Sequence, residues 1–165
     1  MEFRHLSQKF YNDYPQLQYP EMMSKDDRPY TLTITSVDGL LFAVPLRSDI
    51  NHDYNVLWTD KANRHGLDFT KAILILDLDY IDYSEKVFIR SKEHKHLLGK
   101  EHRVKQKMEK CIEDYRNAKN NLSIVHNQLY CSFSTLQYFE EYILDDSQDV
   151  ENTDNNIAEN KDATN

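Results

Sequence analysis

A six-residue segment in the first third of the chain collects the polar groups that phosphodiester cleavage requires. Positions 47–52 read Arg-Ser-Asp-Ile-Asn-His and supply a guanidinium, a hydroxyl, an amide and an imidazole. Histidine suits proton transfer because its unperturbed pKa is about 6.5, and the planar guanidinium of arginine can pair two phosphate oxygens at once. These groups suit metal-independent cleavage of RNA, in which the 2′-hydroxyl attacks the adjacent phosphorus. The alternative interpretation is that His52 and Arg47 are ordinary exposed residues of a loop.

The rest of the sequence offers no competing metal or cofactor site. His94 and His96 are two residues apart in a predicted helix, so they face nearly opposite sides and cannot share an ion. Asp77, Asp79 and Asp82 alternate with other residues, and we interpret them as structural because a magnesium site usually draws carboxylates from several elements. No phosphate-binding loop, dinucleotide fingerprint or nucleophile elbow occurs. We therefore expect neither a metal nor a cofactor.

The net charge of −8 is distributed unevenly along the chain. Positions 145–165 hold seven acids and one base, so they carry −6 and the preceding residues only −2. Positions 86–116 hold ten of the twenty Lys and Arg residues and five acids, a net charge of +5. Such a segment is typical of a surface that contacts RNA phosphates. It is also typical of a solvated helix face that carries internal ion pairs.

Length and composition indicate a single domain. A chain of 165 residues with 39% hydrophobic residues can bury one core, and we assign residues 1–144 to it. The acidic, Asn-rich stretch 145–165 has no aromatic residue and is expected to be a disordered tail. No apolar run approaches the roughly 18 residues of a membrane-spanning helix, and Met1–His5 lacks the pattern of a secretory signal, so we expect a cytoplasmic protein. Cys111 and Cys131 are interpreted as reduced and buried.

The polar segment must be positioned by the elements around it, and the first of these is a hairpin. Tyr30–Val37 alternates residue by residue, Asp38-Gly39 is a strong turn signal, and Leu40–Val44 returns as the partner strand. Pro45 cannot donate a ladder hydrogen bond, so we predict that the strand ends there and that Leu46–Tyr54 is a loop. Loops on a rigid sheet are frequent sites of chemistry.

Further strands and helices complete the predicted fold. Strands are expected at Phe3–Leu6, Asn55–Thr59, Phe69–Leu76 and Leu78–Tyr83, with a short helical turn that Ser7 caps and Pro15 ends. Helical spacing of Leu97, Val104, Met108, Cys111, Ile112 and Tyr115 predicts one long helix over 91–120, with its basic residues on the other side. A capping box at Ser134–Gln137, with Phe133 and Tyr138 as its staple, opens a helix through Tyr142. The predicted class is α+β: a small, mostly antiparallel β-barrel with a long basic helix and a C-terminal helix.

Three stretches resemble the ToxN/AbiQ superfamily of type III toxin-antitoxin toxins. Positions 43–48, Ala-Val-Pro-Leu-Arg-Ser, resemble its strand-exit motif, in which a Pro-Leu pair precedes a small hydroxyl residue and Ser. Positions 66–73, Gly-Leu-Asp-Phe-Thr-Lys-Ala-Ile, are similar to its Gly-Leu stretch that leads through a Lys into an apolar strand. Positions 131–136, Cys-Ser-Phe-Ser-Thr-Leu, are similar to its closing Cys-x-Phe-Ser-x-Leu helix start. The order matches, and positions 47–52 look closest to the TenpN branch.

This resemblance implies an SH3-like barrel of the MazF/Kid type and sequence-preferring endoribonuclease activity that leaves a 2′,3′-cyclic phosphate. It also implies inhibition by a repeated RNA pseudoknot in a hetero-oligomeric toxin-RNA assembly, and a role in phage defence. By position, Ser48 matches the family's active-site Ser, Lys71 its strand Lys, and Arg28 an active-site Lys. The chain departs from the family at Arg47, which replaces a hydroxyl residue, and at Asp49-Ile50, where a Lys is missing.

We therefore predict two groups of site residues. The predicted catalytic group is Arg28, Arg47, Ser48 and His52, with the arginines on the scissile phosphate, Ser48 on one of its oxygens and His52 as general base or acid. The predicted RNA-binding group is Asn51, Lys61, Arg64, Lys71, Lys92, Lys95, Lys100 and Arg103. Two alternatives stay open: a non-catalytic RNA-binding or protein-binding module on the same barrel, and a globular protein whose motifs match by chance.

Overall fold

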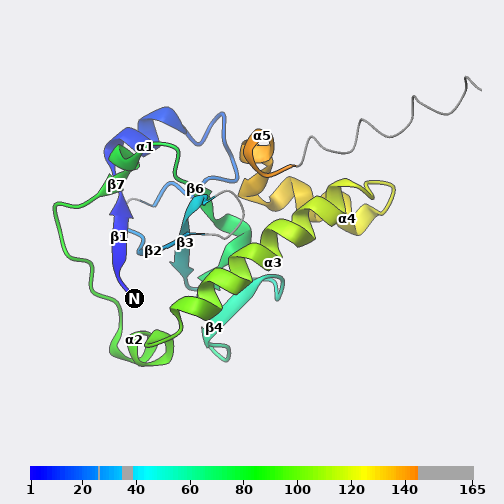
Figure 1. The fold of residues 1–165 in the computed structure, drawn as a ribbon. Coiled ribbons are helices and arrows are strands. Elements are labelled where there is room, and N and C mark those ends of the chain that lie inside the picture. Colours follow the sequence, from blue (N-terminus) through cyan, green and yellow to red (C-terminus); the bar gives the residue numbers. More distant parts are fainter. Residues whose placement is uncertain (26, 35–38, 145–165) are drawn as a thin grey trace, which may run out of the picture.

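The computed structural model describes residues 1–25, 27–34 and 39–144, which form an antiparallel sheet with helices around it (Figure 1). Its seven strands are β1 (Phe3–Leu6), β2 (Tyr30–Ile34), β3 (Leu41–Arg47), β4 (Val56–Asp60), β5 (His65–Asp68), β6 (Ile73–Leu74) and β7 (Ile81–Asp82). Their order is β4-β5-β3-β2-β1-β7, and β6 also pairs with β3. The predicted α+β class is confirmed. The sheet is open in the described ranges, where β4 and β7 are its two ends.

The predicted hairpin is confirmed where it is described. β2 and β3 pair from Tyr30↔Pro45 to Ile34↔Leu41. The predicted turn residue Asp38 lies outside the described residues. Its neighbour Gly39 has a φ of +64°, a left-handed conformation that glycine adopts without steric cost. The antiparallel pairing of β2 with β3 thus agrees with the predicted hairpin on either side of the turn.

The prediction that Pro45 ends the strand is wrong, because β3 continues to Arg47. Pro45 lies between Phe42-Ala43, which pair with β6, and Leu46-Arg47, which pair with β5. Successive backbone N–H groups of a strand point to opposite edges, and the N–H of Leu46 donates to the Pro29 carbonyl at 2.8 Å. The missing N–H of Pro45 therefore faces the gap between β6 and β5. The proline removes no ladder hydrogen bond there.

The prediction of two longer strands between positions 69 and 83 is wrong. This region forms two 3₁₀ helices, η1 (Phe69–Lys71) and η2 (Leu78–Tyr80), followed by the two-residue strands β6 and β7. The aspartates before the 3₁₀ helices explain the difference. Asp68 and Asp77 each cap one by accepting a hydrogen bond from the backbone N–H two residues later. Strand β5, which precedes η1, is not predicted because His-Gly-Leu-Asp lacks an alternating apolar pattern.

The single helix predicted over 91–120 is in fact two, α2 (Ser91–Leu97) and α3 (Glu101–Lys119). Gly99 between them has a φ of +71°, and the N–H of Lys100 donates to the Leu97 carbonyl at 3.0 Å. A left-handed glycine of this kind terminates a helix. The predicted apolar stripe is confirmed, since all of its members are buried: Leu97, Val104, Met108, Cys111, Ile112 and Tyr115.

The C-terminal helical region is predicted only in part. The unpredicted helix α4 (Val125–Phe133) precedes the 3₁₀ helix η3 (Thr135–Phe139) and the short α5 (Glu140–Ile143). Ser134 is the N-cap of η3, as predicted, but its own N–H donates to the Tyr130 carbonyl of α4 at 3.1 Å. Gln137 therefore does not close a capping box. Its amide instead donates to the carbonyls of Ser132 and Ser134.

The helices enclose the core from several sides (Figure 1). α3 packs against β2 and α4 packs against α3, while α1 (Gln8–Asp13), capped by Ser7 as predicted, lies at the end opposite α2. Both cysteines are free and buried, which confirms that prediction. Burial raises the pKa of the Cys111 thiol to about 12. None of the described helices is long and apolar enough to cross a membrane.

Replacing Gly99 tests the break between α2 and α3. Gly99→Ala is expected to lower the free energy of unfolding by about 1 kcal/mol, because alanine is strained in the left-handed conformation. In a continuous helix the same change would stabilise the protein by about 1 kcal/mol. Chemical denaturation measures whether the substitution lowers or raises the free energy of unfolding. Gly99→Asn is the matched control and should lose less stability, since asparagine tolerates this conformation better. A stabilising Gly99→Ala would contradict the observed break.

Candidate active site

The buried carboxylate of Asp68 joins two of the predicted catalytic side chains. Asp68 ends β5 and is 0% exposed. Its Oδ2 accepts a hydrogen bond from Nη1 of Arg47 and lies 3.2 Å from Nε2 of His52. Its Oδ1 accepts from the backbone N–H and the hydroxyl of Thr70, at 3.1 and 2.6 Å. Both oxygens are therefore engaged, and the carboxylate fixes Arg47 and His52 relative to each other.

The register between β3 and β5 creates this contact. Arg47 is paired with Gly66, and Asp68 lies two residues beyond Gly66 on the same face of β5. Diagonal neighbours on one face of a sheet are within reach of a side chain as long as that of Arg47. A Cβ on Gly66 would lie only 2.6 Å from the Leu57 carbonyl oxygen of β4. Glycine at position 66 thus allows the close approach of β4.

Arg64 holds the loop that carries His52. Its guanidinium donates to the carbonyls of Ile50 and His52, at 2.5 and 2.8 Å, and to the Asp53 carboxylate at 3.0 Å. It also lies over the Trp58 ring, 4.6 Å from the centroid, a favourable cation-π contact. These contacts make Arg64 a positioning residue for the loop. Its predicted contact with RNA stays a prediction.

The two ring nitrogens of His52 have different surroundings. Nε2 faces the Asp68 carboxylate, whereas Nδ1 is buried and has no hydrogen-bond partner among the described residues. A carboxylate favours the tautomer in which the nitrogen facing it carries the proton. Nδ1 then holds the free lone pair. The imidazole is thus oriented as in a carboxylate-histidine pair, with its other nitrogen buried and His52 lining the adjoining cleft.

Opposing effects set the pKa of Asp68. Burial alone would raise it, but hydrogen bonds from His52 and Thr70 and the positive charge of Arg47 outweigh burial, so the pKa falls below the ordinary value of 3.8. The carboxylate is therefore ionised at neutral pH. Its charge compensates the Arg47 guanidinium, whose side chain is largely buried.

An open cleft of about 490 Å³ adjoins this cluster. That volume is within the usual range for small-molecule sites, roughly 300 to 1,000 Å³. The cleft is lined by Arg47, Asn51, His52, Tyr54, Thr70, Lys71, His126, Leu129, Tyr130, Phe133 and Ser134. Two predicted catalytic residues and two predicted RNA-binding residues therefore share one space with several aromatic rings.

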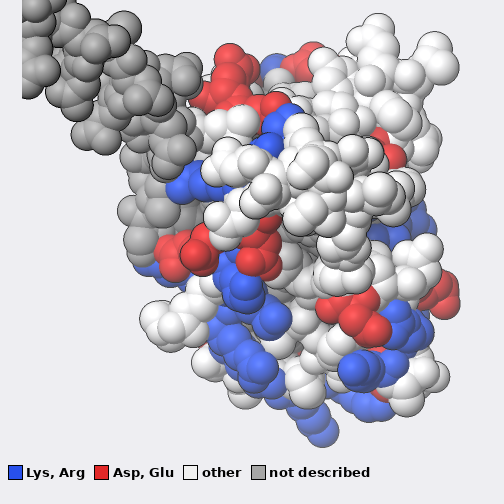
Figure 2. Space-filling view, turned by 90° about the vertical axis from the view of Figure 1, so that its right-hand side faces the viewer, with Lys and Arg blue, Asp and Glu red and all other residues white. Residues whose placement is uncertain are grey.

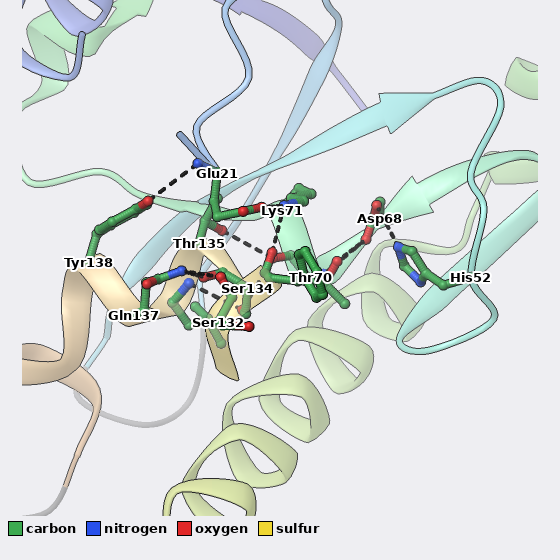
Figure 3. A network of polar contacts seen from close by, with 12 residues as sticks. Glu21, His52, Asp68, Thr70, Lys71, Ser132, Ser134, Thr135, Gln137 and Tyr138 are labelled. Atoms are coloured by element: carbon green, nitrogen blue, oxygen red, sulfur yellow. Dashed lines mark hydrogen bonds and ion pairs between the residues drawn. The ribbon is translucent and has the colours of Figure 1, made fainter. Parts of the chain in front are cut away.

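A continuous set of polar contacts supports the cleft (Figure 3). It runs from His52 through Asp68 to Thr70 of η1. The Thr70 carbonyl then accepts hydrogen bonds from the hydroxyls of Ser134 and Thr135, both at 3.2 Å. The His52 loop, the end of β5 and the start of η3 are therefore linked by side chains, although they are far apart in the sequence.

Lys71 is engaged in this framework. Its ammonium forms an ion pair with the Glu21 carboxylate and donates to the Phe133 carbonyl at 2.5 Å (Figure 3). The backbone N–H of Glu21 in turn donates to the Tyr138 hydroxyl at 3.3 Å. Lys71 therefore ties the segment before β2 to the end of α4. Its charge is compensated by Glu21, and it still lines the cleft.

The other two predicted catalytic residues, Arg28 and Ser48, line a smaller pocket of about 230 Å³. Arg47 lines both this pocket and the cleft. The structure therefore does not bring all four predicted catalytic side chains into one space. It places Arg47 between a pocket that contains Arg28 and Ser48 and a cleft that contains His52.

The smaller pocket has more cations than acids in its lining, with Lys25, Arg28, Arg47 and Arg90 against Asp27 and Glu93. Burial lowers the pKa of Arg28, and the nearby charge of Arg47 acts in the same direction. The Nε atoms of both arginines are buried and lack a hydrogen-bond partner within the described part of the chain. Buried donors of this kind are costly unless a ligand or water satisfies them. The arrangement suits an anion that would bind between the two guanidinium groups.

The remaining predicted RNA-binding residues line neither the cleft nor the smaller pocket. They are Lys61, Arg64, Lys92, Lys95, Lys100 and Arg103. Lys92 of α2 forms an ion pair with the Asp60 carboxylate of β4. This matches the alternative, left open by the sequence, that part of the basic segment is a solvated face with ion pairs.

Asp68 and the aromatic side chains of the cleft are not among the site residues predicted from the sequence. The only local signal for Asp68 is the Asp-x-Thr spacing to Thr70, which is typical of an aspartate that caps a turn. His126 and Tyr130 lie on the unpredicted α4, and no signal in the sequence placed that helix beside the His52 loop. Searches with models of protein families and against curated proteins and solved structures found no match for the chain.

Removing the Asp68 charge tests its role. Asp68→Asn is expected to lower the free energy of unfolding at pH 7 by about 3 kcal/mol, because Arg47 loses the partner of a largely buried ion pair. Since its pKa is lowered by folding, Asp68 contributes full stability above about pH 4, its unfolded pKa, and loses it as the pH falls through the folded value. The variant should therefore show less acid destabilisation than the wild type.

Urea denaturation between pH 2 and pH 7 measures this difference. Asp53→Asn is the matched control, because Asp53 pairs with Arg64 at an exposed position and should contribute less than about 1 kcal/mol. Equal stabilities of wild type and Asp68→Asn at pH 7 would contradict the inferred role of the carboxylate.

Proposed function

We propose that the chain is a metal-independent endoribonuclease and the toxin of a type III toxin-antitoxin system, similar to the ToxN/AbiQ superfamily. One observation carries the proposal: the three stretches that resemble the family surround one cleft. Arg47 comes from the first stretch, Thr70 and Lys71 from the second, and Phe133 and Ser134 from the third.

Direct contacts between these stretches support the proposal. Arg47 of the first binds Asp68 of the second, and the hydroxyl of Thr135 in the third donates to the Ala72 carbonyl of the second at 2.5 Å. Sequence motifs that match by chance have no reason to meet in space. Their convergence on a cleft with a histidine and an arginine favours a shared active site over a fortuitous resemblance.

The proposed reaction uses the charges of this cluster. His52 takes the proton of the 2′-hydroxyl, and the 2′-oxygen forms a bond to the adjacent phosphorus. Arg47 stabilises the added negative charge on the five-coordinate phosphorus. The bond to the 5′-oxygen then breaks, that oxygen takes a proton from solvent water, and a 2′,3′-cyclic phosphate remains. In the alternative assignment His52 acts as the acid: it donates a proton to the 5′-oxygen, and water accepts the proton of the 2′-hydroxyl.

The smaller pocket supplies a second contact to the RNA backbone. Because Arg28 and Ser48 share Arg47 with the cleft, they suit the phosphate next to the scissile one. Arg47 then contacts both phosphates. Arg47 would in this way take over the role of the Lys that follows the Ser in the family. The chain has Asp49 and the fully buried Ile50 after Ser48.

Several finer features belong to the same proposal. The family resemblance leads us to interpret the sheet, in which β3 pairs with β2, β5 and β6, as a variant of an SH3-like barrel of the MazF/Kid type. The basic residues of α2 and α3 would contact target RNA and a pseudoknot RNA antitoxin in a hetero-oligomeric assembly. Cytoplasmic location and a role in phage defence follow from the same resemblance.

A non-catalytic RNA-binding or protein-binding module is the second candidate. The observation in its favour is that position 50 is buried and apolar, so the family's nearby Lys has no substitute there. Cleavage distinguishes the two candidates, since a binding module would retain RNA without breaking it.

Cleavage in the presence of EDTA tests the proposal. Purified protein incubated with single-stranded RNA should yield fragments with 2′,3′-cyclic phosphate ends. His52→Ala should lower the rate by about 100- to 10,000-fold, the usual contribution of a general acid or base. Arg47→Lys should lower it by about 100- to 1,000-fold, because lysine lacks the planar fork. Expression of the wild type without its RNA should arrest bacterial growth, and His52→Ala should not.

The matched control is His94→Ala, which removes an exposed histidine of α2 outside the cleft. It should cleave like the wild type. Tight RNA binding without cleavage would favour the binding module. Equal cleavage by the wild type and His52→Ala would remove the cleft from the mechanism.

A further inference from the structure

The cleft is lined by cationic side chains and also by aromatic rings that take no part in the proposed cleavage chemistry. Tyr54 and Phe133 are 54% and 59% exposed, whereas large apolar side chains are usually buried. The ring of Tyr54 contacts the ring of His126 with centroids 5.0 Å apart. Tyr54 follows the His52 loop and His126 lies on α4, so two distant elements build one platform. The platform lines the same cleft as Arg47 and His52.

A second hollow lies on the other side of this platform. Tyr54, His126 and Tyr130 also line an adjoining pocket of about 360 Å³. The opposite wall of that pocket includes Asp114 and Asn117 of α3 and Asn121, which follows the helix. The aromatic rings therefore separate a cationic cleft from a pocket that is rich in amide groups. Amide side chains offer both donors and acceptors to a nucleobase edge.

The wall of α3 continues as a cationic stripe. Arg103, Lys107 and Lys110 are spaced by four and three residues, so they lie on one helix face, and the same face reaches Asp114 and Asn117. Burial and the charges of Arg103 and Lys110 lower the pKa of Lys107, as expected where cations gather. Figure 2 shows the face on the right-hand side of Figure 1, where Lys and Arg gather in the lower part with Asp and Glu among them, beside a mostly uncharged surface.

We propose that this face binds single-stranded RNA, with one nucleobase stacked on the Tyr54-His126 platform and the backbone following the cationic stripe of α3. This inference rests on the proposed function. It adds the nucleobase and the stretch of backbone that the protein would hold beside the scissile phosphate. Cationic residues interleaved with aromatic rings are the usual means of binding a single strand. A duplex fits less well, because its bases are already stacked and paired.

A protein partner fits the same surface less well. An apolar segment laid over the platform would supply no counter-charge to Arg103 and Lys107 of the neighbouring α3 stripe. An RNA strand supplies both a planar ring for the aromatic face and phosphates for the cations. The occupant that the chemistry selects is therefore a nucleotide.

A comparison of two uncleavable oligonucleotides tests the inference. The first is a mixed-sequence hexamer of 2′-O-methyl ribonucleotides, which lacks the attacking hydroxyl. The second is an abasic hexamer with the same number of phosphates. Wild-type protein should bind the base-bearing hexamer about 5- to 100-fold more tightly, the range expected for stacking one base on an aromatic side chain. Fluorescence anisotropy of labelled hexamers measures both dissociation constants.

Variants separate the contribution of the bases from that of the phosphates. Tyr54→Ala should bring the ratio of the two dissociation constants close to one, whereas Tyr54→Phe should retain it. Lys107→Gln should weaken binding of both hexamers equally and leave the ratio unchanged. Tyr83→Ala is the matched control, because Tyr83 is similarly exposed, at 57%, and lies outside the cleft and the adjoining pocket.

Each outcome bears on one claim. A ratio that Tyr54→Ala leaves as large as in the wild type would overturn the platform while preserving RNA binding. A dimer that Tyr54→Ala dissociates would assign the face to a second copy of the chain and would also overturn the platform. Failure of the wild type to bind either hexamer would overturn the proposed function, and the inference with it.

Discussion

The buried carboxylate of Asp68 is the interaction on which the candidate site depends. Its two oxygens hold Arg47, His52 and Thr70, and Thr70 in turn contacts the start of η3. A charge buried in this way is tolerated only when its partners compensate it. The guanidinium and the imidazole are therefore not independent surface residues. They are held together by an anion that the sheet carries between them, and the cleft forms beside that cluster.

Elements whose signals are local could be predicted from the sequence. The hairpin, the Ser7 cap and the buried stripe of α3 depend on residue types within a few positions of each other. The end of β3 could not be predicted, because Pro45 is harmless only where β3 changes its pairing from β6 to β5. The break at Gly99 could not be predicted either, since an isolated glycine is also tolerated inside a helix.

The same reasoning applies to the candidate site. Arg47 and His52 could be selected because they are close in sequence and chemically suited to phosphate cleavage. Asp68 could not, because its role arises only from the register that pairs Arg47 with Gly66. The division between the cleft and the smaller pocket depends on tertiary packing in the same way. Arg47 lies in both, so a single side chain connects what the sequence suggested would be one group of residues.

The most direct test of the central claim is an NMR titration that follows the His52 imidazole and the Arg47 guanidinium. Wild-type protein is mixed with a 2′-O-methyl RNA that cannot be cleaved, and the nitrogen signals of both side chains are recorded. If Asp68 presents them together to the scissile phosphate, both signals should shift, and both shifts should depend on RNA concentration in the same way. Saturable binding that shifts signals of α2 lysines and leaves Arg47 and His52 unchanged would contradict this account.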